Sequence, residues 1–346
     1  MMLVLGIRSA SMGHAFFSRA RPHFFSNWRG RALRPQYIMD TLQKLLFPQA
    51  TVRAETVTLD ASFSEAVAHQ NLPLAVRRLA GEVTASALLA AAALQYDGTV
   101  ILQVAGDGPV KLLVVEVRPE LVYRVSVTLR DKDASIDVNA GMRALINANG
   151  RGQCALILDP ANRPQGVQPY QGIVALTGDS FAEVMTNYFI TSEQVQTYIA
   201  LASDEARVGG LMLQKMPSMG GKALPDNYDP EGWDRLKMFA QTVKSEELLT
   251  LSPEEIHRRL FWEESPLVTF EGKPIFRCRC SDEGVRQMIR SLGHDEAKSI
   301  IDEMGEIEVT CHYCGQTRHF DAIDVETIFS KAPVQAVSET RHESES

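Results

Sequence analysis

The sequence has little cysteine and no long apolar run. Only five cysteines occur in 346 residues, and their clustering does not match the disulfide framework of a small secreted domain. Residues 2–7 are apolar, but a helix that spans a membrane needs about 20 such residues. We therefore expect no membrane partner, and the cysteine usage is typical of a protein in a reducing compartment such as the cytoplasm.

The chain also lacks a basic surface for nucleic acid. Its formal net charge is −8 at pH 7, and residues 1–36 hold six arginines and no acidic residue. The rest of the chain is therefore more acidic than the total suggests. Because a nucleic-acid surface needs clustered Lys and Arg to contact phosphates, we expect no nucleic-acid partner.

A catalytic motif is missing as well. No Ser, His and Asp set with a motif context occurs in residues 36–220, and Gly106–Pro109 lacks the GxxxxGK[ST] form of a phosphate-binding loop. His14 and His69 are isolated in the sequence, and we expect both on the surface. The chain is not expected to be an enzyme.

Four of the five cysteines form two short clusters near the C-terminus, a CxC pair and a CxxC pair with thirty residues between them. A tetrahedral set of four thiolates is typical of structural zinc. His312 and His319 lie close by, but with four cysteines available neither is expected to be a ligand. The predicted ligands of one zinc ion are Cys278, Cys280, Cys311 and Cys314.

The spacing leaves two other uses of these thiols open: a pair of disulfides, or alternation between metal and disulfides. Residues two apart in an extended segment lie about 6.6 Å apart, close to the limit of about 6.8 Å for bridged Cα atoms. A bridge between Cys278 and Cys280 would therefore be strained, and strained exposed disulfides are the labile, regulatory ones. Arg277 and Arg279 flank these sulfurs and favour the thiolate, which binds metal and reacts with oxidants.

Composition divides the chain into parts. Residues 1–35 are rich in arginine, as in an organellar transit peptide, or they precede a true start at Met12 or Met39. Glycines and prolines between 217 and 230 mark a boundary. The predicted parts are a disordered basic extension at 1–35, a core domain at 36–220, an acidic helical linker at 221–266, a zinc domain at 267–330 and a disordered tail at 331–346.

The core domain is expected to pack helices on an antiparallel sheet, which makes the chain α+β. Leu74–Leu94 follows Pro73 and is apolar all round in its second half, so it predicts a buried helix. Cys154 lies in an apolar run and is expected to be an inert core thiol. Strands are expected at 52–59, 99–105, 110–117, 121–130, 154–158, 170–176, 196–202 and 211–216, with a hairpin turn at 106–109 and further helices at 37–47, 62–70 and 180–191.

The linker combines acidity with helical patterns. Residues 226–264 hold ten acidic and five basic residues. Ser252–Glu255 is a capping box with proline at the first helical position, and Trp233, Leu236 and Phe239 begin an apolar stripe. We expect a pair of short helices, which are marginal unless they pack on another surface. The segment is therefore either an element that orders and disorders or a plain helical connector.

The zinc domain is expected to be too small for a self-sufficient core, so it needs the metal for stability. Gly293 separates two predicted helices. The expected elements are helices at 282–292 and 295–304, a strand at 306–310, its hairpin partner at 316–320 and a closing helix at 324–329.

The cysteine pattern resembles that of the zinc-dependent, redox-regulated thirty-three-kilodalton heat-shock protein family. Four other stretches resemble those of the family and occur in its order: Gly106–Pro109, Tyr170–Val174, Ser192–Gln194 and Gly209–Gln214. The resemblance covers residues 36 to 329 and includes both the cysteine pairs and these dispersed motifs.

The resemblance implies an ATP-independent holdase chaperone that binds unfolding or oxidatively damaged proteins. It implies a reduced, zinc-bound form that is inactive and an oxidised form that is active and dimeric. It also implies disulfides Cys278–Cys280 and Cys311–Cys314. The expected location is the cytoplasm, or an organellar matrix if residues 1–35 are a transit peptide.

Two other functions remain as alternatives. The first is a static zinc-ribbon binding module. The acidic charge of the chain after residue 36 and the CxC spacing of the first cysteine pair make it less favoured. The second is a thiol oxidoreductase that uses Cys311 and Cys314, but no thioredoxin-like βαβ pattern surrounds this CxxC.

Overall fold

The computed structural model describes residues 3–4, 40–164, 166–216 and 227–330. It divides into two compact units, one of residues 17–278 and one of residues 1–16 and 279–346. The predictions for residues 1–35 and 331–346 fall outside the described residues, apart from β1 (Leu3–Val4), which pairs with β13 (Ile307–Cys311).

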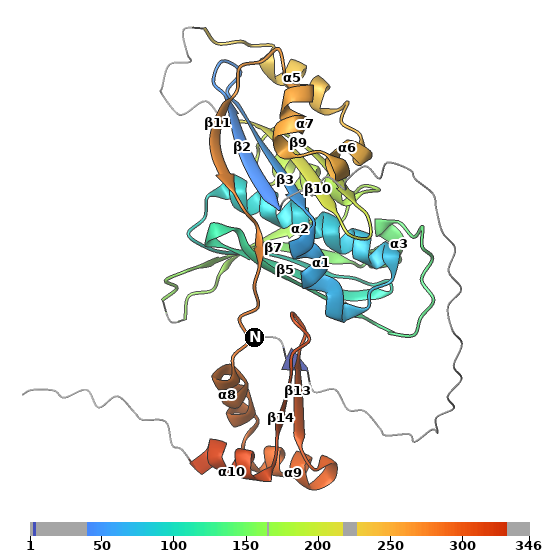
Figure 1. Cartoon of the computed structure of the whole chain (residues 1–346), viewed down its shortest axis with the longest axis vertical. Coiled ribbons are helices and arrows are strands. Elements are labelled where there is room, and N and C mark those ends of the chain that lie inside the picture. The colour runs from blue at the N-terminus through green and yellow to red at the C-terminus, as the bar shows by residue number, and fades with distance from the viewer. Residues whose placement is uncertain (1–2, 5–39, 165, 217–226, 331–346) are drawn as a thin grey trace, which may run out of the picture. The chain divides into compact units, whose positions relative to one another are not determined.

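The larger unit has two sheets with the long helix α2 between them (Figure 1). All strand pairs are antiparallel except that of β12 with β6. The five-stranded sheet has the order β11 (Leu267–Gly272), β2 (Thr41–Phe47), β3 (Val52–Leu59), β10 (Val208–Lys215) and β9 (Thr197–Ser203). The six-stranded sheet has the order β12 (Ile275–Phe276), β6 (Val122–Leu129), β5 (Val110–Arg118), β4 (Gly98–Ala105), β7 (Gln153–Pro160) and β8 (Tyr170–Val174). The α+β class is confirmed.

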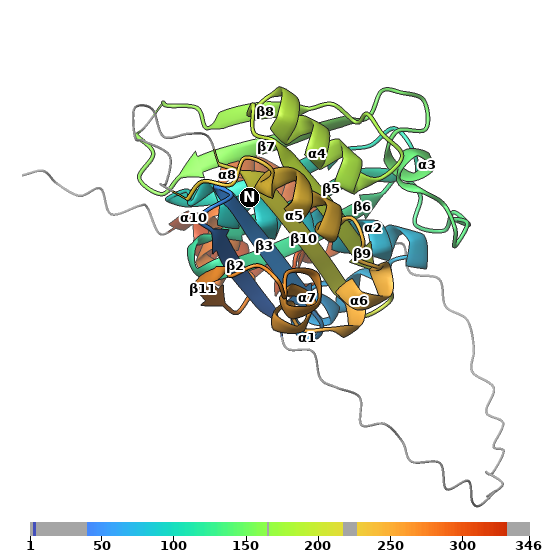
Figure 2. The same cartoon turned by 90° about the horizontal axis from the view of Figure 1, so that it is seen from above.

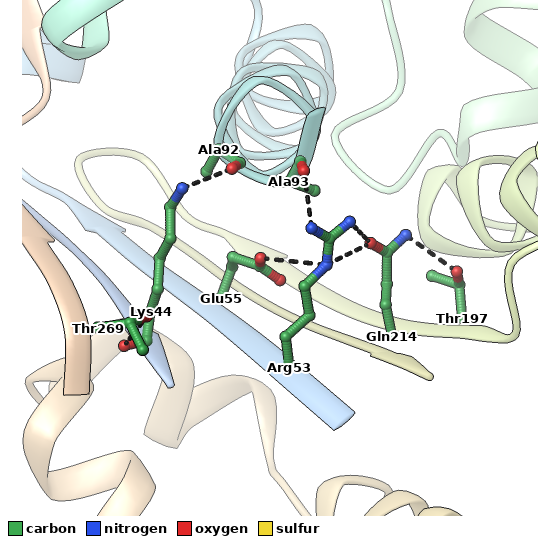
Figure 3. A network of polar contacts seen from close by, with 8 residues as sticks. All are labelled: Lys44, Arg53, Glu55, Ala92, Ala93, Thr197, Gln214 and Thr269. Carbon is green, nitrogen blue, oxygen red and sulfur yellow. Dashed lines mark hydrogen bonds and ion pairs between the residues drawn. The ribbon is translucent and has the colours of Figure 1, made fainter. Parts of the chain in front are cut away.

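Helix α2 (Leu74–Leu94) confirms the predicted buried helix. Pro73 precedes it, and Gln95 ends it in a left-handed conformation with φ 50°. Two side chains of the five-stranded sheet bind the last turn of α2 (Figure 3). Lys44 Nζ donates to the Ala92 carbonyl at 2.5 Å, and Arg53 Nη1 donates to the Ala93 carbonyl at 2.8 Å. Cations at these positions also suit the negative end of the helix dipole. Among the helices of the described residues, α2 included, none has the length and apolarity needed to cross a membrane.

The predicted hairpin is also confirmed. Strands β4 and β5 pair as far as Ala105 and Leu112 around the turn. A Cβ atom at Gly108 would lie 2.6 Å from the Ala144 carbonyl oxygen, so this position needs glycine because the backbone of a neighbouring segment approaches it closely. The shorter helices of the unit are α1 (Ala61–Val67), α3 (Met142–Ile146) and α4 (Phe181–Thr191).

Three short helices cover the other face of the five-stranded sheet: α5 (Gly232–Ala240), α6 (Ser245–Thr250) and α7 (Pro253–Leu260). In Figure 2 they lie over its strands. The side chains of β3 alternate between the two faces of the sheet. Val57 and Leu59 belong to the apolar cluster with α2, whereas Val52 and Ala54 belong to the cluster with α5–α7. Strand β3 is therefore buried on both sides.

The described part of the smaller unit consists of the β13–β14 hairpin, the short strand β1 beside β13, and three helices. Its apolar core is small and includes Val285 and Ile289 from α8, Ile307 and Val309 from β13, and Phe320 from β14. The predicted helices on either side of Gly293, the hairpin and the closing helix are all present. The elements are α8 (Asp282–Leu292), α9 (His294–Met304), β13, β14 (Thr317–Phe320) and α10 (Ala322–Ser330).

Three local predictions were wrong. Residues 41–47 of the predicted helix at 37–47 form strand β2, since a strand with both faces covered can bury Leu42 on one side and Leu45 on the other and so imitate helical spacing. The strands at 196–202 and 211–216 were expected to complete the same sheet as the hairpin strands, but they belong to a second sheet. The linker has three helices, not two, because α6 was not predicted.

Candidate metal centre

The first cysteine pair lies at the start of α8. Residues 275–276 form β12, which pairs with β6, and the Arg277 amide donates to the Tyr123 carbonyl at 3.0 Å. Cys278 and Cys280 follow directly, and the Ser281 hydroxyl then accepts from the Gly284 amide at 3.1 Å to cap α8. A strand and a helix cap thus fix the backbone on both sides of the pair.

The second pair lies in the turn between β13 and β14. The Gly315 amide donates to the Cys311 carbonyl at 2.8 Å, and the Cys311 amide donates to the Gln316 carbonyl at 3.0 Å. Gly315 has φ +70°, a left-handed conformation that glycine adopts without the penalty of a Cβ atom. This turn brings the sulfurs of Cys311 and Cys314 to the same side.

The two pairs meet. The four sulfurs of Cys278, Cys280, Cys311 and Cys314 all lie within 4.8 Å of one another, and those of Cys280 and Cys314 are 3.4 Å apart. A tetrahedral zinc site with Zn–S bonds of about 2.3 Å holds its sulfurs about 3.8 Å apart. The four side chains therefore fit one tetrahedral metal ion. Cys311 is buried and the other three are half-buried.

Arg318 on β14 is a cation at this cluster that the sequence analysis missed. Its Nε donates to Asp282 Oδ1 at 2.6 Å, and its Nη2 donates to Gln316 Oε1 at 3.1 Å. Its pKa is raised above the ordinary value, mainly by the hydrogen bond to Asp282 and further by Cys280. A positive group here would offset part of the negative charge of a divalent metal ion held by four thiolates. The signal in the sequence was weak, because Arg318 is only one of several arginines near the cysteines.

The histidines and the fifth cysteine lie outside the sulfur cluster. His319 Nδ1 lies 3.1 Å from Glu306 Oε1 on the exposed side of the hairpin. It belongs to a separate, fully exposed group with Glu306 and Glu308, whereas the sulfur group itself holds no histidine. Cys154 on β7 is 1% exposed, and burial raises its pKa to about 12, so it is the inert core thiol that was predicted. His69, predicted to lie on the surface, is half-buried, and His14 lies outside the described residues.

The chain is similar to proteins of one family. A family model described as "Hsp33 protein" matches residues 40–321. A protein named "33 kDa chaperonin" from Methylobacillus flagellatus is 39% identical over 88% of this chain and 99% of its own length. A protein of the same name from Chromobacterium violaceum is 38% identical over 88% of this chain and 98% of its own.

A solved structure agrees in fold. The crystal structure of the 33 kDa chaperonin (Heat shock protein 33 homolog) from Thermotoga maritima has a TM-score of 0.69 to this chain. It covers 84% of this chain and 98% of its own length, at 19% identity.

Proposed function

The chain belongs to the Hsp33 family, and from this premise we propose that it is a redox-regulated, ATP-independent holdase chaperone. The reduced, metal-bound form is inactive, and the oxidised form binds unfolding or oxidatively damaged proteins and prevents their aggregation. The observation that carries the proposal is the group of four cysteine sulfurs within 4.8 Å of one another in the C-terminal part of the chain.

The proposed metal is one zinc ion. Cys278, Cys280, Cys311 and Cys314 would hold it as thiolates, and no histidine is needed. Zinc bound in this way contributes about 10–16 kcal/mol of apparent binding free energy to a small fold. The smaller unit has a core of few residues, so it depends on this contribution.

Oxidation removes the ligands. In each pair two thiols lose two electrons and two protons to a peroxide, one S–S bond forms, and the peroxide is reduced to two molecules of water. The family resemblance assigns the pairs as Cys278–Cys280 and Cys311–Cys314. Since a disulfide sulfur is no longer a thiolate, the smaller unit loses the stabilisation that the metal supplies and unfolds.

The linker is the element that this unfolding would release. Helices α5–α7 cover the outer face of the five-stranded sheet with Trp233, Leu236, Leu248, Ile256 and Phe261, all buried. None of these helices is long enough to be stable without packing. When they leave the sheet, apolar residues on both surfaces reach solvent, and exposed apolar patches bind other apolar surfaces.

The segment between the linker and the first cysteine couples the two events. Strand β11 pairs with β2 at the edge of one sheet, and β12 pairs with β6 at the edge of the other. The Phe276 ring packs edge-on against Tyr123 with ring centroids 6.5 Å apart. Arg277 makes a hydrogen bond to this sheet immediately before Cys278. Loss of order at the cysteines would therefore weaken the strand pairing of the segment that follows α7.

The proposed chaperone function also implies the partners and the location of the protein. The partners are unfolded client proteins, and the resemblance implies a homodimer in the oxidised state. The action needs no catalytic site, because clients are held by apolar contact. We place the protein in the cytoplasm, where thiols stay reduced until oxidative stress occurs. Residues 1–35, on which an organellar location depends, lie outside the described residues.

The test is to treat the reduced, zinc-loaded protein with hydrogen peroxide at mildly raised temperature. Zinc release and suppression of client aggregation are followed together. We expect about one zinc per chain to leave as the thiols oxidise, with suppression rising in step. A Cys154→Ala variant serves as the matched control and should respond like the wild type, because Cys154 lies outside the cluster. Zinc retention, or zinc loss without any gain in suppression, would refute the proposal.

A further inference from the structure

A single histidine joins the linker to the middle of the sheet. His257 lies on α7 and is 6% exposed. Its Nε2 lies 2.6 Å from Thr56 Oγ1 on β3, and its Nδ1 lies 2.8 Å from Gln43 Oε1 on β2. The same imidazole therefore contacts two neighbouring strands of the face that the linker covers.

The surrounding hydrogen bonds indicate which nitrogen of the neutral His257 ring carries the proton. Gln43 Nε2 donates to Glu271 Oε2 on β11 at 3.0 Å, so the other atom of the amide, Oε1, faces His257 as an acceptor. Nδ1 must then carry the proton, and Nε2 accepts from the Thr56 hydroxyl. The Thr56 hydroxyl could turn and accept from a protonated Nε2, so the cost of a second proton is that it puts a cation into a buried site.

The charged groups around His257 do not compensate such a cation. From β3, Arg53 and Glu55 point to the opposite face of the sheet, toward α2, and so does Lys44 from β2 (Figure 3). The Glu271 carboxylate is separated from the ring by the Gln43 amide. Two charged side chains of α6 and α7 have other partners: Glu247 pairs with Arg259, and Glu255 accepts from the Ser252 amide. The others, Glu246, Glu254 and Arg258, are exposed.

We infer that His257 is an acid-sensitive latch, and that its protonation releases α7 from the five-stranded sheet without oxidation of the cysteines. The inference rests on the proposed function in one respect, namely that the face beneath the linker is the hidden binding surface. It adds a second trigger, a proton, at a place distant in the sequence from the metal ligands.

The direction of the pH effect follows from burial. Burial lowers the pKa of His257 from 6.5 to about 4, whereas a released α7 would expose the ring at its ordinary value. The released form therefore binds more protons between pH 6.5 and 4, and docking weakens as the pH falls through this window. Between pH 7.5 and 5.5 the ratio of released to docked α7 should rise about tenfold.

The other face of the sheet responds in the opposite sense. Burial raises the pKa of Glu55 from 4.5 to about 7, so the folded form of the larger unit binds an additional proton between pH 7 and 4.5. This group makes the core more stable as the pH falls. Mild acid thus loosens the linker and strengthens the α2 side of the same sheet.

Hydrogen exchange on the full-length, reduced, zinc-loaded protein tests the latch. The amides of residues 256–260 are compared at pH 7.5 and 5.5 after correction for intrinsic exchange rates, and bound zinc is measured in the same samples. We expect protection in the wild type to fall about tenfold with zinc retained. In His257→Gln, which cannot titrate, the fall should disappear. His294→Gln removes an exposed histidine and should leave it in place.

A double exchange covers the case in which His257→Gln does not dock at neutral pH. Gln43→Glu with Glu271→Gln keeps their hydrogen bond but places a carboxylate against Nδ1, so the docked imidazolium gains a counter-ion. The acid-induced loss of protection should shrink or reverse. An unchanged loss in this variant, or in a docked His257→Gln, would overturn the inference, as would a wild type with equal protection at both pH values.

The readout also separates the latch from the proposed function. If oxidised wild type fails to suppress client aggregation while the pH effect on α7 persists, the proposed function fails and the latch stands. If oxidation activates the protein but α7 protection does not change with pH, the latch alone fails.

Discussion

The two faces of the five-stranded sheet are covered in different ways. On one face lies α2, a single helix of 21 residues that is enclosed by the second sheet on its other side. On the other face lie α5, α6 and α7, with 9, 6 and 8 residues. The covered surfaces are alike in kind, since both use the alternating apolar residues of the same strands.

The difference between the covers predicts different roles for the two faces. Helix α2 packs against both sheets, so exposing it would disrupt the core between them. The face that it covers therefore stays buried for as long as the unit is folded. The linker packs on one side only, and large apolar residues of the same stretch, Met238 and Trp262, remain 57% and 72% exposed. Elements with few buried contacts open at a lower free energy than the core does. The account therefore predicts that the linker face can be uncovered while the α2 face stays closed.

The largest effect is expected from the metal ligands. Replacing all four cysteines of the cluster by serine should abolish zinc binding, which contributes about 10–16 kcal/mol to folds of this kind. The smaller unit should unfold and the linker should detach without oxidant, while the thermal transition of the larger unit persists. Metal content, dye binding to apolar surface and calorimetry check this. A zinc-free variant as compact and as free of dye as the wild type would contradict the comparison.

A pair of cavity variants compares the two covers directly. Leu88 in α2 and Leu236 in α5 are both 0% exposed. Leu88→Ala should lower the free energy of unfolding of the larger unit by about 2–5 kcal/mol. Leu236→Ala should instead release the linker. The destabilisation it causes is limited to the free energy with which the linker docks on the sheet, so the larger unit should stay folded. Calorimetry and hydrogen exchange on 227–264 measure the two effects. Equal losses of global stability would show that both covers belong to one cooperative unit.

Two adjacent glycines on β10, Gly209 and Gly210, face opposite sides of the five-stranded sheet. A Cβ atom at Gly209 would meet the Leu248 carbonyl oxygen of α6, whereas one at Gly210 would meet Leu89 of α2 at 3.0 Å. Overpacking of this kind costs about 1–3 kcal/mol. Gly209→Ala should displace α6 and raise dye binding with the main thermal transition unchanged. Gly210→Ala should lower that transition instead, and an identical response from both variants would count against the separation.

The smallest effect is expected at two helix caps. Ser252 accepts from the Glu255 amide at 3.2 Å to cap α7, and Ser180 accepts from the Glu183 amide at 3.2 Å to cap α4. Loss of such a cap costs about 1 kcal/mol. Ser252→Ala should raise the hydrogen-exchange rate of α7 about fivefold with the main transition unaffected, whereas Ser180→Ala should lower the main transition slightly. A Ser252→Ala variant with normal α7 exchange would weaken the view that the linker is marginal.

The sequence predicted the elements that carry strong local signals. Helix α2, the β4–β5 hairpin, the cap at Ser252 and the two helices on either side of Gly293 all appear as expected, because each depends on neighbours along the chain. The sulfur cluster was predictable for another reason: cysteine is rare in this chain, and its pairs have the spacing of metal ligands.

The features that depend on tertiary contacts were not predictable. Strand β2 imitates a helix because both of its faces are buried. The division of the strands between two sheets depends on long-range pairing, such as that of β3 with β10. His257 occurs in a charged stretch, and only the contacts to Thr56 and Gln43 identify it as buried.

The central claim is that oxidation of the cysteine cluster uncovers one face of the sheet and leaves the other closed. Hydrogen exchange on the full-length protein, reduced with zinc and then oxidised with peroxide, tests it most directly. The account predicts that residues 227–264 and 282–330 lose protection while residues 74–94 keep theirs. Unchanged protection of residues 227–264 after oxidation, or equal loss in residues 74–94, would contradict it.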